Sequence, residues 1–483
     1  SSLPSERAQS VMAEGGINAA LNTKDENDSP EEHFTDTIKA ACGLADPNAV
    51  WGMTQAAPEL VHWLLKLGVK FNMSGYDDVD LRNFGGQKKK RTAFAQSDTG
   101  KQIMTAMIDA VRRKEAFGMV ERFSHHSFLT LRLCGNICCG CVIRDEYSQE
   151  TVELPGDAVI VATGGMHGLF GNTTGSLSNT GEVTAELFRL GVPLANGEMI
   201  QYHPTTVKCG GKRMLISEAA RGEGGRLFAM KDGKQWYFME EKYPELGNLM
   251  PRDITAREIW KVSHESEVFL DMTEISEEII SNKLSGLADD CMTYLHKDIR
   301  KEPVSVLPGI HYFMGGILVD EQHRTPIQNL YAAGECCAQY HGANRLGGNS
   351  LLGALYGGRV AAKSACEQAD VVDLSCATQI DFPPASQISE IKQLNKVMQE
   401  TMGVVRNENT LLNGIQTVQA LTGNLPLLGM AVLKSALARK ESRGAHWRED
   451  YPKSNDNDYL KTTVARFDGK QIQISFVPVP ERR

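Results

Sequence analysis

Residues 311–316 read His-Tyr-Phe-Met-Gly-Gly, and residues 342–350 read Gly-Ala-Asn-Arg-Leu-Gly-Gly-Asn-Ser. These two runs set a histidine and an arginine beside glycine-rich backbone. Both side chains can bind a carboxylate, and glycines let backbone N–H groups approach a flat or phosphorylated cofactor closely. The two runs therefore point to a site in which a small anion meets a bound cofactor.

The rest of the chain alternates between strand and helix patterns over residues 1–197. Residues 157–163 form a short apolar run that ends at Gly164 and Gly165. This is typical of a buried parallel strand whose carboxyl end faces a ligand. Residues 329–335 repeat the pattern. We therefore expect the first domain to be interrupted and completed after residue 317, with an inserted second domain between about 198 and 316.

The C-terminal part has a different pattern. Apolar residues recur at helical spacing between Ile388 and Ser442, and a last strand is expected at residues 471–476. The spaced apolar residues are Ile391, Leu394, Val397 and Met398, followed by Leu411, Leu412, Ile415 and Val418. We interpret this part as a helical packing domain.

Three more segments carry polar residues: Gln-Tyr-His-Pro-Thr at 201–205, Ser-Glu-Ala-Ala-Arg-Gly-Glu-Gly-Gly at 217–225 and Pro-Arg-Asp at 251–253. With the two glycine-rich runs, in this order over most of the chain, they resemble the flavoprotein subunit of succinate dehydrogenase and fumarate reductase. The resemblance implies an α/β fold with a discontinuous Rossmann-like FAD-binding domain (1–197 plus 317–384). An inserted α+β capping domain (198–316) would interrupt it, and a helical C-terminal domain and tail (385–483) would follow.

One element of that family is not visible. The family opens with a strand and a G-x-G-x-x-G turn that holds the FAD pyrophosphate at a helix N-terminus. No such motif occurs near Ser1. Either the chain is a fragment that lacks this strand and loop, or the protein binds FAD without the motif. We favour the fragment, because all the downstream segments are in register.

The resemblance also implies a flavin site. Members with covalently bound flavin carry a histidine directly before the Ser/Thr of the segment that runs along the isoalloxazine ring. Gln9 stands there, so we expect non-covalent FAD. Glu335 would bind the ribityl hydroxyls, and Glu182 replaces the usual Asp. The full set assigned to FAD is Ser10, Ala13, Glu14, Gly15, Gly16, Thr163, Gly164, Gly165, Glu182, Glu335, Arg345, Ser350 and Leu351.

A fumarate site needs a clamp for each carboxylate, a hydride source on one face of the double bond and a proton donor on the other. The hydroxyl of Ser217 can donate a hydrogen bond, and the guanidinium of Arg345 can hold a carboxylate in a bidentate way. The resemblance implies six contacts: His203 with Ser217 at one carboxylate, His311 with Arg345 at the other, and Phe84 with the backbone of Gly15 beside the substrate.

Arg252 matches the family's proton donor, and Glu218 and Arg221 match the relay that returns its proton. Glu218 and Arg221 are three residues apart, so on a helix they would share a face. The resemblance implies a CH–CH oxidoreductase. Hydride would pass between flavin N5 and one substrate carbon while Arg252 protonates or deprotonates the neighbouring carbon. Without the other motifs, Arg252 and Asp253 would suggest only a surface ion pair at a helix start.

Two alternatives remain open. One is L-aspartate oxidase, a relative that usually has RGEGA where this chain has RGEGG at 221–225. An aspartate site must also hold an ammonium group, and Glu218, already assigned to the relay, is the only acid expected nearby. The other alternative is a non-catalytic flavin-binding fragment. An in-frame glycine motif upstream would argue against it.

Composition limits the remaining function classes. A chain of 483 residues with a net charge of −9 suggests two or three domains and gives no reason to expect nucleic-acid binding. No run of 18 apolar residues and no signal peptide is visible. We expect a cytoplasmic protein, attached to a membrane only through partner subunits. The resemblance alone implies an iron–sulfur electron-transfer partner.

The eleven cysteines are an odd count in a large chain and suggest free thiols in a reducing compartment. The group at Cys134, Cys138, Cys139 and Cys141 does not have the usual spacing of iron–sulfur ligands. Strand patterns at residues 128–133 and 141–144, with a turn at Gly135, explain it better. We expect no metal site.

Overall fold

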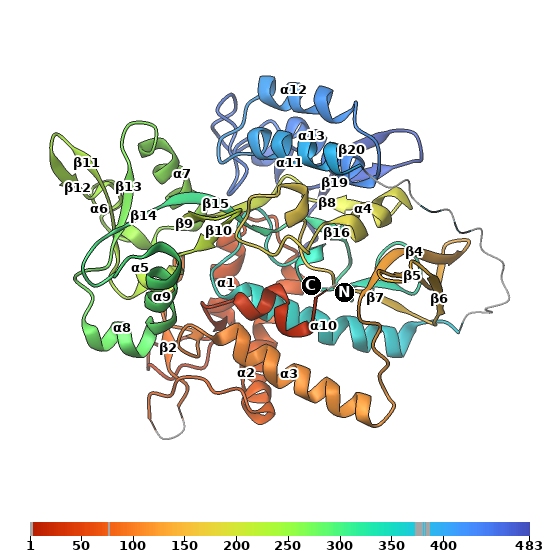
Figure 1. The fold of residues 1–483 in the computed structure, drawn as a ribbon, viewed down its shortest axis with the longest axis horizontal. Helices are drawn as coiled ribbons and strands as arrows, with labels where there is room; N and C mark the ends of the chain where they lie inside the picture. The colour runs from red at the N-terminus through yellow and green to blue at the C-terminus, as the bar shows by residue number, and fades with distance from the viewer. Residues whose placement is uncertain (1–2, 76–77, 372–379, 381, 383–386) are drawn as a thin grey trace.

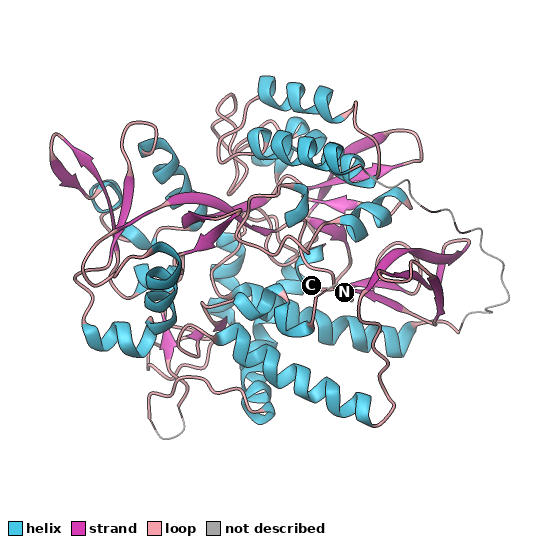
Figure 2. Ribbon diagram, in the orientation of Figure 1, coloured by secondary structure: helices cyan, strands magenta, loops and turns pink. Residues whose placement is uncertain are grey.

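The computed structural model describes residues 3–75, 78–371, 380, 382 and 387–483. It is a mixed structure of helices and small sheets (Figures 1 and 2). Its helices are α1 (Pro30–Ala40), α2 (Pro47–Leu67), α3 (Thr99–Ala116), α4 (Glu182–Arg189), α5 (Glu218–Gly222), α6 (Phe238–Lys242), α7 (Arg252–Val262), α8 (Glu277–Lys283), α9 (Ser285–Asp290), α10 (Asn349–Gln368), α11 (Ile388–Thr401), α12 (Glu408–Val418), α13 (Asn424–Ala438) and α14 (Asp456–Tyr459).

The expected strand near residue 160 is β7 (Val159–Val161), and it pairs in parallel with β17 (Leu330–Ala332). The parallel pairing is confirmed, but the expectation of a fully buried strand is wrong. Ile160 keeps 41% of its surface exposed. Among the described residues β7 is paired only with β17, so one side of the strand remains uncovered.

A three-stranded antiparallel sheet lies at the centre of the molecule (Figure 1). Its middle strand is β9 (Ile200–Cys209), flanked by β10 (Lys212–Leu215) and β15 (Leu307–Phe313). Side chains alternate along a strand, and Tyr202 donates a hydrogen bond to the Met402 carbonyl in the C-terminal part (2.9 Å). Gln201 and His203 therefore point to the other face of the sheet.

The segment between β9 and β15 has its own sheet and hydrophobic core. The strands are, in spatial order, β12 (Lys234–Trp236), β11 (Arg226–Lys231), β13 (Val268–Asp271) and β14 (Val304–Ser305). Leu227, Phe238, Ile259 and Leu270 are among the buried residues that pack with α6 to α9. The segment forms the left part of Figure 1, and α5 and α7 belong to its core through Ala219, Ala220 and Ile259.

The predicted C-terminal helices are confirmed as α11, α12 and α13. Leu394, Met398, Leu411 and Val418 are buried in one core with Leu428 of α13. The predicted last strand is β20 (Ile472–Pro478). It closes a five-stranded sheet in the order β18 (Cys337–Ala338), β16 (Gly316–Leu318), β8 (Leu194–Ala195), β19 (Lys461–Phe467) and β20. This sheet joins the C-terminal part to the strands near the site.

The cysteine-rich segment forms the predicted hairpin. β4 (His126–Cys134) and β5 (Ile137–Asp145) pair across the turn at Gly135, and β6 (Thr151–Pro155) completes the sheet. Nine of the described cysteines are free, as expected, but Cys134 is disulfide-bonded, which corrects the expectation of free thiols throughout.

The last sheet has the order β1 (Ile17–Asn18), β3 (Thr92–Ala93) and β2 (Leu81–Arg82). It packs against α2 and α3, and Ile17, Ala93, Met53 and Ile103 share its core. Through β1 it supports the glycine segment that precedes Ile17. None of the described helices is long and apolar enough to span a membrane.

Candidate active site

A cavity of about 480 Å³ lies where β9, β15, α5, α7 and α10 meet the N-terminal segment. Most of the residues expected to bind substrate or cofactor line it: Ser10, Ala13, Glu14, Gly15, Gly16, Phe84, Gly164, His203, Ser217, Glu218, Arg252, His311, Glu335, Arg345, Ser350 and Leu351. A larger hollow of about 710 Å³ lies beside the five-stranded sheet and contains none of the expected residues. The chemistry of the lining, rather than size, identifies the smaller cavity as the site.

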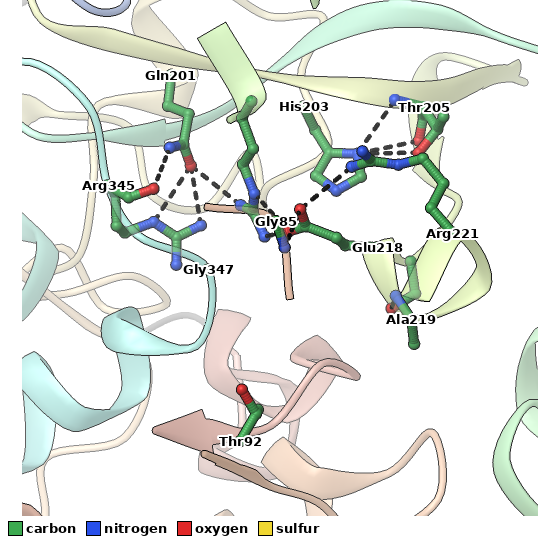
Figure 3. Close-up of polar contacts among 12 residues, drawn as sticks. Gly85, Thr92, Gln201, His203, Thr205, Glu218, Ala219, Arg221, Arg345 and Gly347 are labelled. Carbon is green, nitrogen blue, oxygen red and sulfur yellow. Dashed lines mark hydrogen bonds and ion pairs between the residues drawn. The ribbon is translucent and has the colours of Figure 1, made fainter. Parts of the chain in front are cut away.

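Glu218 binds two arginines at the cavity wall. Its Oε2 accepts hydrogen bonds from Arg252 Nε (2.8 Å) and Nη2 (2.6 Å), and its Oε1 lies 3.3 Å from Arg221 Nη2. Oε1 also accepts the backbone N–H of Gly85 (3.1 Å). Figure 3 shows Arg221 and Gly85 around Glu218. Arg252 thus pairs with Glu218 rather than with Asp253, and the predicted shared face of Glu218 and Arg221 is confirmed on α5.

The charges of this cluster are mutually dependent. Burial raises the pKa of Glu218, but the guanidinium groups of Arg252 and Arg221 outweigh it, so the pKa is lowered. Burial lowers the pKa of Arg221, which Glu218 opposes. Glu218 is therefore a carboxylate near neutral pH. The two guanidinium groups thus oppose protonation of Glu218 as long as they stay charged.

Gln201 connects the two arginines that face the cavity. Its carboxamide oxygen accepts hydrogen bonds from Arg252 Nη1 (3.0 Å) and from Arg345 Nε (3.2 Å) and Nη2 (3.1 Å). Its amide nitrogen donates to the Arg345 carbonyl (2.9 Å) and to Asn344 Oδ1 (3.0 Å). Figure 3 shows Gln201 above Arg345. The sequence segment at 201–205 includes Gln201, but its type gave no signal for this role.

The two histidines expected in separate clamps lie next to each other. The centroids of the His203 and His311 rings are 5.1 Å apart, in an edge-to-face arrangement. The β9–β15 register shifts between Ile310 and Tyr312, and such an irregularity re-aims a side chain. Burial and the charge of Arg252 lower the pKa of both rings well below the usual value, so both are neutral imidazoles. His311 Nδ1 lies 2.8 Å from Thr174 Oγ1, which leaves Nε2 for a ligand.

The other end of the cavity has walls of bare backbone. A Cβ on Gly16 would lie 2.5 Å from the Ala93 carbonyl oxygen, and a Cβ on Gly348 would lie 2.1 Å from Asn18 Oδ1. Gly348 has φ +84° and precedes α10, so Ser350 and Leu351 bring the first turn of that helix to the cavity. The internal packing thus requires glycine at both positions. Because these glycines line the cavity with the first turn of α10, a flat ring system can approach the backbone there closely, and the residues present fit a flavin.

Three residues expected at the cofactor do not line the cavity. Thr163 lies exposed beyond the end of β7, and Glu182 lies exposed at the N-terminus of α4. Gly165 packs against Glu335, because a Cβ there would lie 2.7 Å from Glu335 Oε1. Glu335 itself lines the cavity, and its Oε1 accepts the backbone N–H of Phe313 (3.0 Å). Gln9 also lines the cavity, and its Oε1 accepts the Ser176 N–H (2.6 Å).

The expectation that Glu218 is the only nearby acid is wrong. Glu14 and Asp290 also line the cavity. Part of Glu14 faces the cavity, but its Oε2 is buried without a hydrogen-bond partner among the described residues. Burial, with the charge of Asp290, raises the pKa of Glu14 to about 8. Asp290 is the last residue of α9, and because it is far from Glu14 in the chain, this pair could not be predicted from local sequence patterns.

The chain matches family models over most of its length. Residues 1–351 match the model described as "FAD binding domain", and residues 421–482 match "Fumarate reductase flavoprotein C-term". The chain is 37% identical to the succinate dehydrogenase flavoprotein subunit of Bacillus subtilis, over 100% of this chain and 93% of that protein. It is 32% identical to the 8-methylmenaquinol:fumarate reductase flavoprotein subunit of Wolinella succinogenes (99% and 86%) and 32% identical to the L-aspartate oxidase of a Nostoc species (95% and 87%).

Solved structures give the same picture. A mutated quinol fumarate reductase from E. coli superposes with a TM-score of 0.88 at 27% identity, over 98% of this chain and 90% of that one. The Sdh1 complex of Mycobacterium smegmatis with UQ1 gives a TM-score of 0.83 at 28% identity, over 100% and 90%.

Proposed function

Because the chain belongs to the FAD-dependent flavoproteins of the succinate dehydrogenase and fumarate reductase family, we propose that it interconverts succinate and fumarate. The observation that carries the proposal is the cluster of Arg252, Glu218 and Arg221. Arg252 and Glu218 line the same cavity as His203, His311 and Arg345, and Arg221 lies behind Glu218 without lining it. A dicarboxylate and a proton donor can therefore come together in one cavity, beside walls that fit a flavin.

Arg345 and the histidines hold the substrate dianion in this proposal. Arg345 is buried, and burial together with the charge of Arg252 lowers its pKa. A bound carboxylate compensates that unfavourable charge. His203 and His311 donate from neutral rings, and Ser217, which caps α5, adds a hydroxyl donor. Phe84 packs against Gly15 and limits the room beside the substrate.

Arg252 gives a proton to, or takes one from, the substrate carbon. Arginine is a weak acid, so the transfer requires a strongly basic carbanion and immediate reprotonation. Glu218, with two hydrogen bonds to Arg252, and Arg221 behind it supply a proton path away from the cavity. Gln201 fixes the guanidinium that performs the transfer. Most of the acceleration then comes from positioning and charge stabilisation.

FAD, when bound, supplies the hydride acceptor and donor for this chemistry. The residues that would hold it are Ser10, Ala13, Glu14, Gly15, Gly16, Gly164, Glu335, Ser350 and Leu351, which line the cavity. We propose a discontinuous FAD-binding domain (1–197 plus 317–384) and an inserted capping domain (198–316). The separate hydrophobic core of the segment between β9 and β15 supports this division. The proposed boundary at 384/385 lies outside the described residues.

We expect the FAD to be held without a covalent bond, because Gln9 has no nucleophilic ring nitrogen. Acid precipitation of the holoenzyme should release all yellow colour into the supernatant. A Gln9→Glu variant is the control: it changes the side chain without adding a nucleophilic nitrogen, and it should release its flavin in the same way. Yellow colour that remains with the washed wild-type pellet would contradict the expectation.

The electron partner is proposed from the relatives. Several of them are named as subunits of succinate dehydrogenase or fumarate reductase. We propose that this chain also works with an iron–sulfur electron-transfer subunit, and that any attachment to a membrane is through partner subunits.

L-aspartate oxidation is the second candidate, because Glu14 and Asp290 give the cavity acids that could face an ammonium group. The test is dye-coupled oxidation of succinate and of L-aspartate by the purified, FAD-loaded protein. The proposal predicts a higher kcat/KM for succinate. A higher kcat/KM for L-aspartate would replace the first function by the second, and oxidation of neither would favour a non-catalytic flavin-binding protein.

A further inference from the structure

A buried histidine beside the cavity has no part in the proposed reaction. His167 lies in a turn of 3-10 helix (His167–Leu169) after β7 and is fully buried. Its ring meets Phe313 edge to face, with centroids 5.0 Å apart. Nε2 has no hydrogen-bond partner in the part of the chain that the structure describes, and Glu335 Oε1 lies 3.5 Å away. A buried polar atom without a partner is costly and requires an explanation.

Thr173 and Glu335 together favour one tautomer of His167. Thr173 Oγ1 accepts the backbone N–H of Gly175 (3.2 Å) and lies 3.0 Å from His167 Nδ1. The threonine hydroxyl can donate its one proton to Nδ1, and the Glu335 carboxylate beside Nε2 can only accept. In a neutral imidazole the proton then sits on Nε2. This arrangement makes Nε2–H a donor that faces the Glu335 carboxylate.

The space for this pair is built into the fold. A Cβ on Gly175 would lie 2.2 Å from the His167 ring, and a Cβ on Gly165 would lie 2.7 Å from Glu335 Oε1. Only glycine at both positions leaves room for the two side chains as they stand. Glu335 Oε1 already accepts the Phe313 N–H (3.0 Å), so a second donor on the same oxygen fixes the plane of the carboxylate. The other oxygen is then left for the cavity.

We propose that His167 is a positioning residue for the cofactor, whose Nε2–H orients the Glu335 carboxylate toward the hydroxyl groups of the ribityl chain of FAD. The inference rests on the proposed placement of Glu335 at the cofactor. A small movement of Glu335 when FAD is bound closes the 3.5 Å gap to a hydrogen bond. His167 then contributes to FAD affinity without touching the substrate.

The test is the dissociation constant of FAD, measured by flavin fluorescence on the full-length protein stripped of flavin. His167→Phe keeps a ring but removes the donor. It should raise the dissociation constant about 2- to 10-fold, the usual effect of one lost hydrogen bond. His167→Gln can accept from Thr173 and donate to Glu335, so it should restore the constant to within about twofold. His323→Phe removes another fully buried imidazole, outside the cavity lining, and should leave the constant within about twofold of wild type.

A double-mutant cycle separates positioning from general damage. In a Glu335→Gln background, His167→Phe should cause little further loss of FAD affinity. An equal loss in both backgrounds, an unchanged constant in His167→Phe, or failure of His167→Gln to restore it would overturn the inference. If His167→Phe does not fold, Thr173→Val removes the hydroxyl that favours this tautomer and should weaken FAD binding in the same way; no weakening there would also overturn it. A Glu335→Gln variant with wild-type affinity would instead refute the placement of Glu335.

Discussion

Two guanidinium groups, those of Arg252 and Arg345, share the carboxamide oxygen of Gln201 as a hydrogen-bond acceptor. Two like charges held this close repel, and burial adds to the cost. Glu218 is shared by Arg252 and Arg221, and Arg345 has no carboxylate partner among the described residues. At the scale of single residues, these three arginines therefore have one carboxylate partner between them, and a bound dicarboxylate supplies the further negative charge.

Arg345→Ala should weaken dicarboxylate binding by about 2–5 kcal/mol, because the other groups cannot replace its fork of donors. The measurement is the dissociation constant of malonate, a dicarboxylate that cannot be oxidised at a CH–CH bond, from flavin difference spectra. Arg324→Ala removes an exposed arginine paired with Asp320 and is the matched control. Unchanged malonate affinity in Arg345→Ala would place the clamp elsewhere.

Glu14 should make the ligand-free protein less stable as pH rises. Its pKa is about 8 in the folded chain, against 4.5 as the usual value. Between these values the folded state keeps a proton that the unfolded state has lost, so the free energy of unfolding falls as pH increases. The glutamine side chain in Glu14→Gln cannot titrate, so this pH-dependent contribution to the free energy of unfolding is absent from the variant.

The melting temperature of wild type should therefore fall relative to that of Glu14→Gln as pH rises from about 5 to about 8. Glu265→Gln, a change at an exposed carboxylate, is the control and should run parallel to wild type. Parallel curves for Glu14→Gln and wild type would show that Glu14 is already ionised over this range.

At the scale of secondary-structure elements, strand β9 supports the site on the side that faces the C-terminal part of the chain. Its start is fixed by Glu198, whose Oε1 accepts from Arg439 Nε (2.7 Å) and Thr463 Oγ1 (2.5 Å). Arg439 is fully buried and also contacts Glu441. Arg406 donates to the Glu198 carbonyl (2.7 Å). The C-terminal part thus anchors the strand whose other face carries Gln201 and His203.

Glu198→Ala should lower the free energy of unfolding by about 3–5 kcal/mol, the usual effect of breaking a buried ion pair. Urea unfolding of the holoenzyme measures it. Glu59→Ala removes an exposed partner of Arg359 and should change stability by less than about 1 kcal/mol. Equal effects of the two changes would contradict the anchoring role.

Local sequence patterns predicted the secondary-structure elements better than they predicted which elements lie next to one another. Helical spacing at Leu394 and Leu411 and the turn at Gly135 gave correct elements because the periodicity of buried residues is a local property. The exposed side of β7 was not predictable, since an apolar run does not show how many strands pair with it. The same holds for Gln201 and for the Glu14–Asp290 pair, which depend on contacts between segments distant in the chain.

At the scale of the whole molecule, the cavity lining runs from Gln9 to Gly358 and is drawn from several segments that lie far apart in the chain. The expected substrate residues, taken from short segments, do lie together around this one cavity. Those segments could be recognised because each has an unusual combination of residue types. Gln201, which accepts hydrogen bonds from Arg252 and Arg345, could not be recognised in this way. Its residue type is common, and only its surroundings in the fold give it this role.

The most direct measurement is fumarate reduction by anaerobic, FAD-loaded protein with reduced viologen, with wild type compared with Arg252→Ala and Arg252→Lys. If Arg252 is the proton donor at the reacting carbon, Arg252→Ala should lose about 10²- to 10⁴-fold in kcat. Its FAD content and malonate binding should stay close to wild type. Arg252→Lys keeps a positive charge beside Glu218 and shows how much of the loss is due to charge alone. A fully loaded Arg252→Ala protein that keeps more than about a tenth of the wild-type rate would contradict the account.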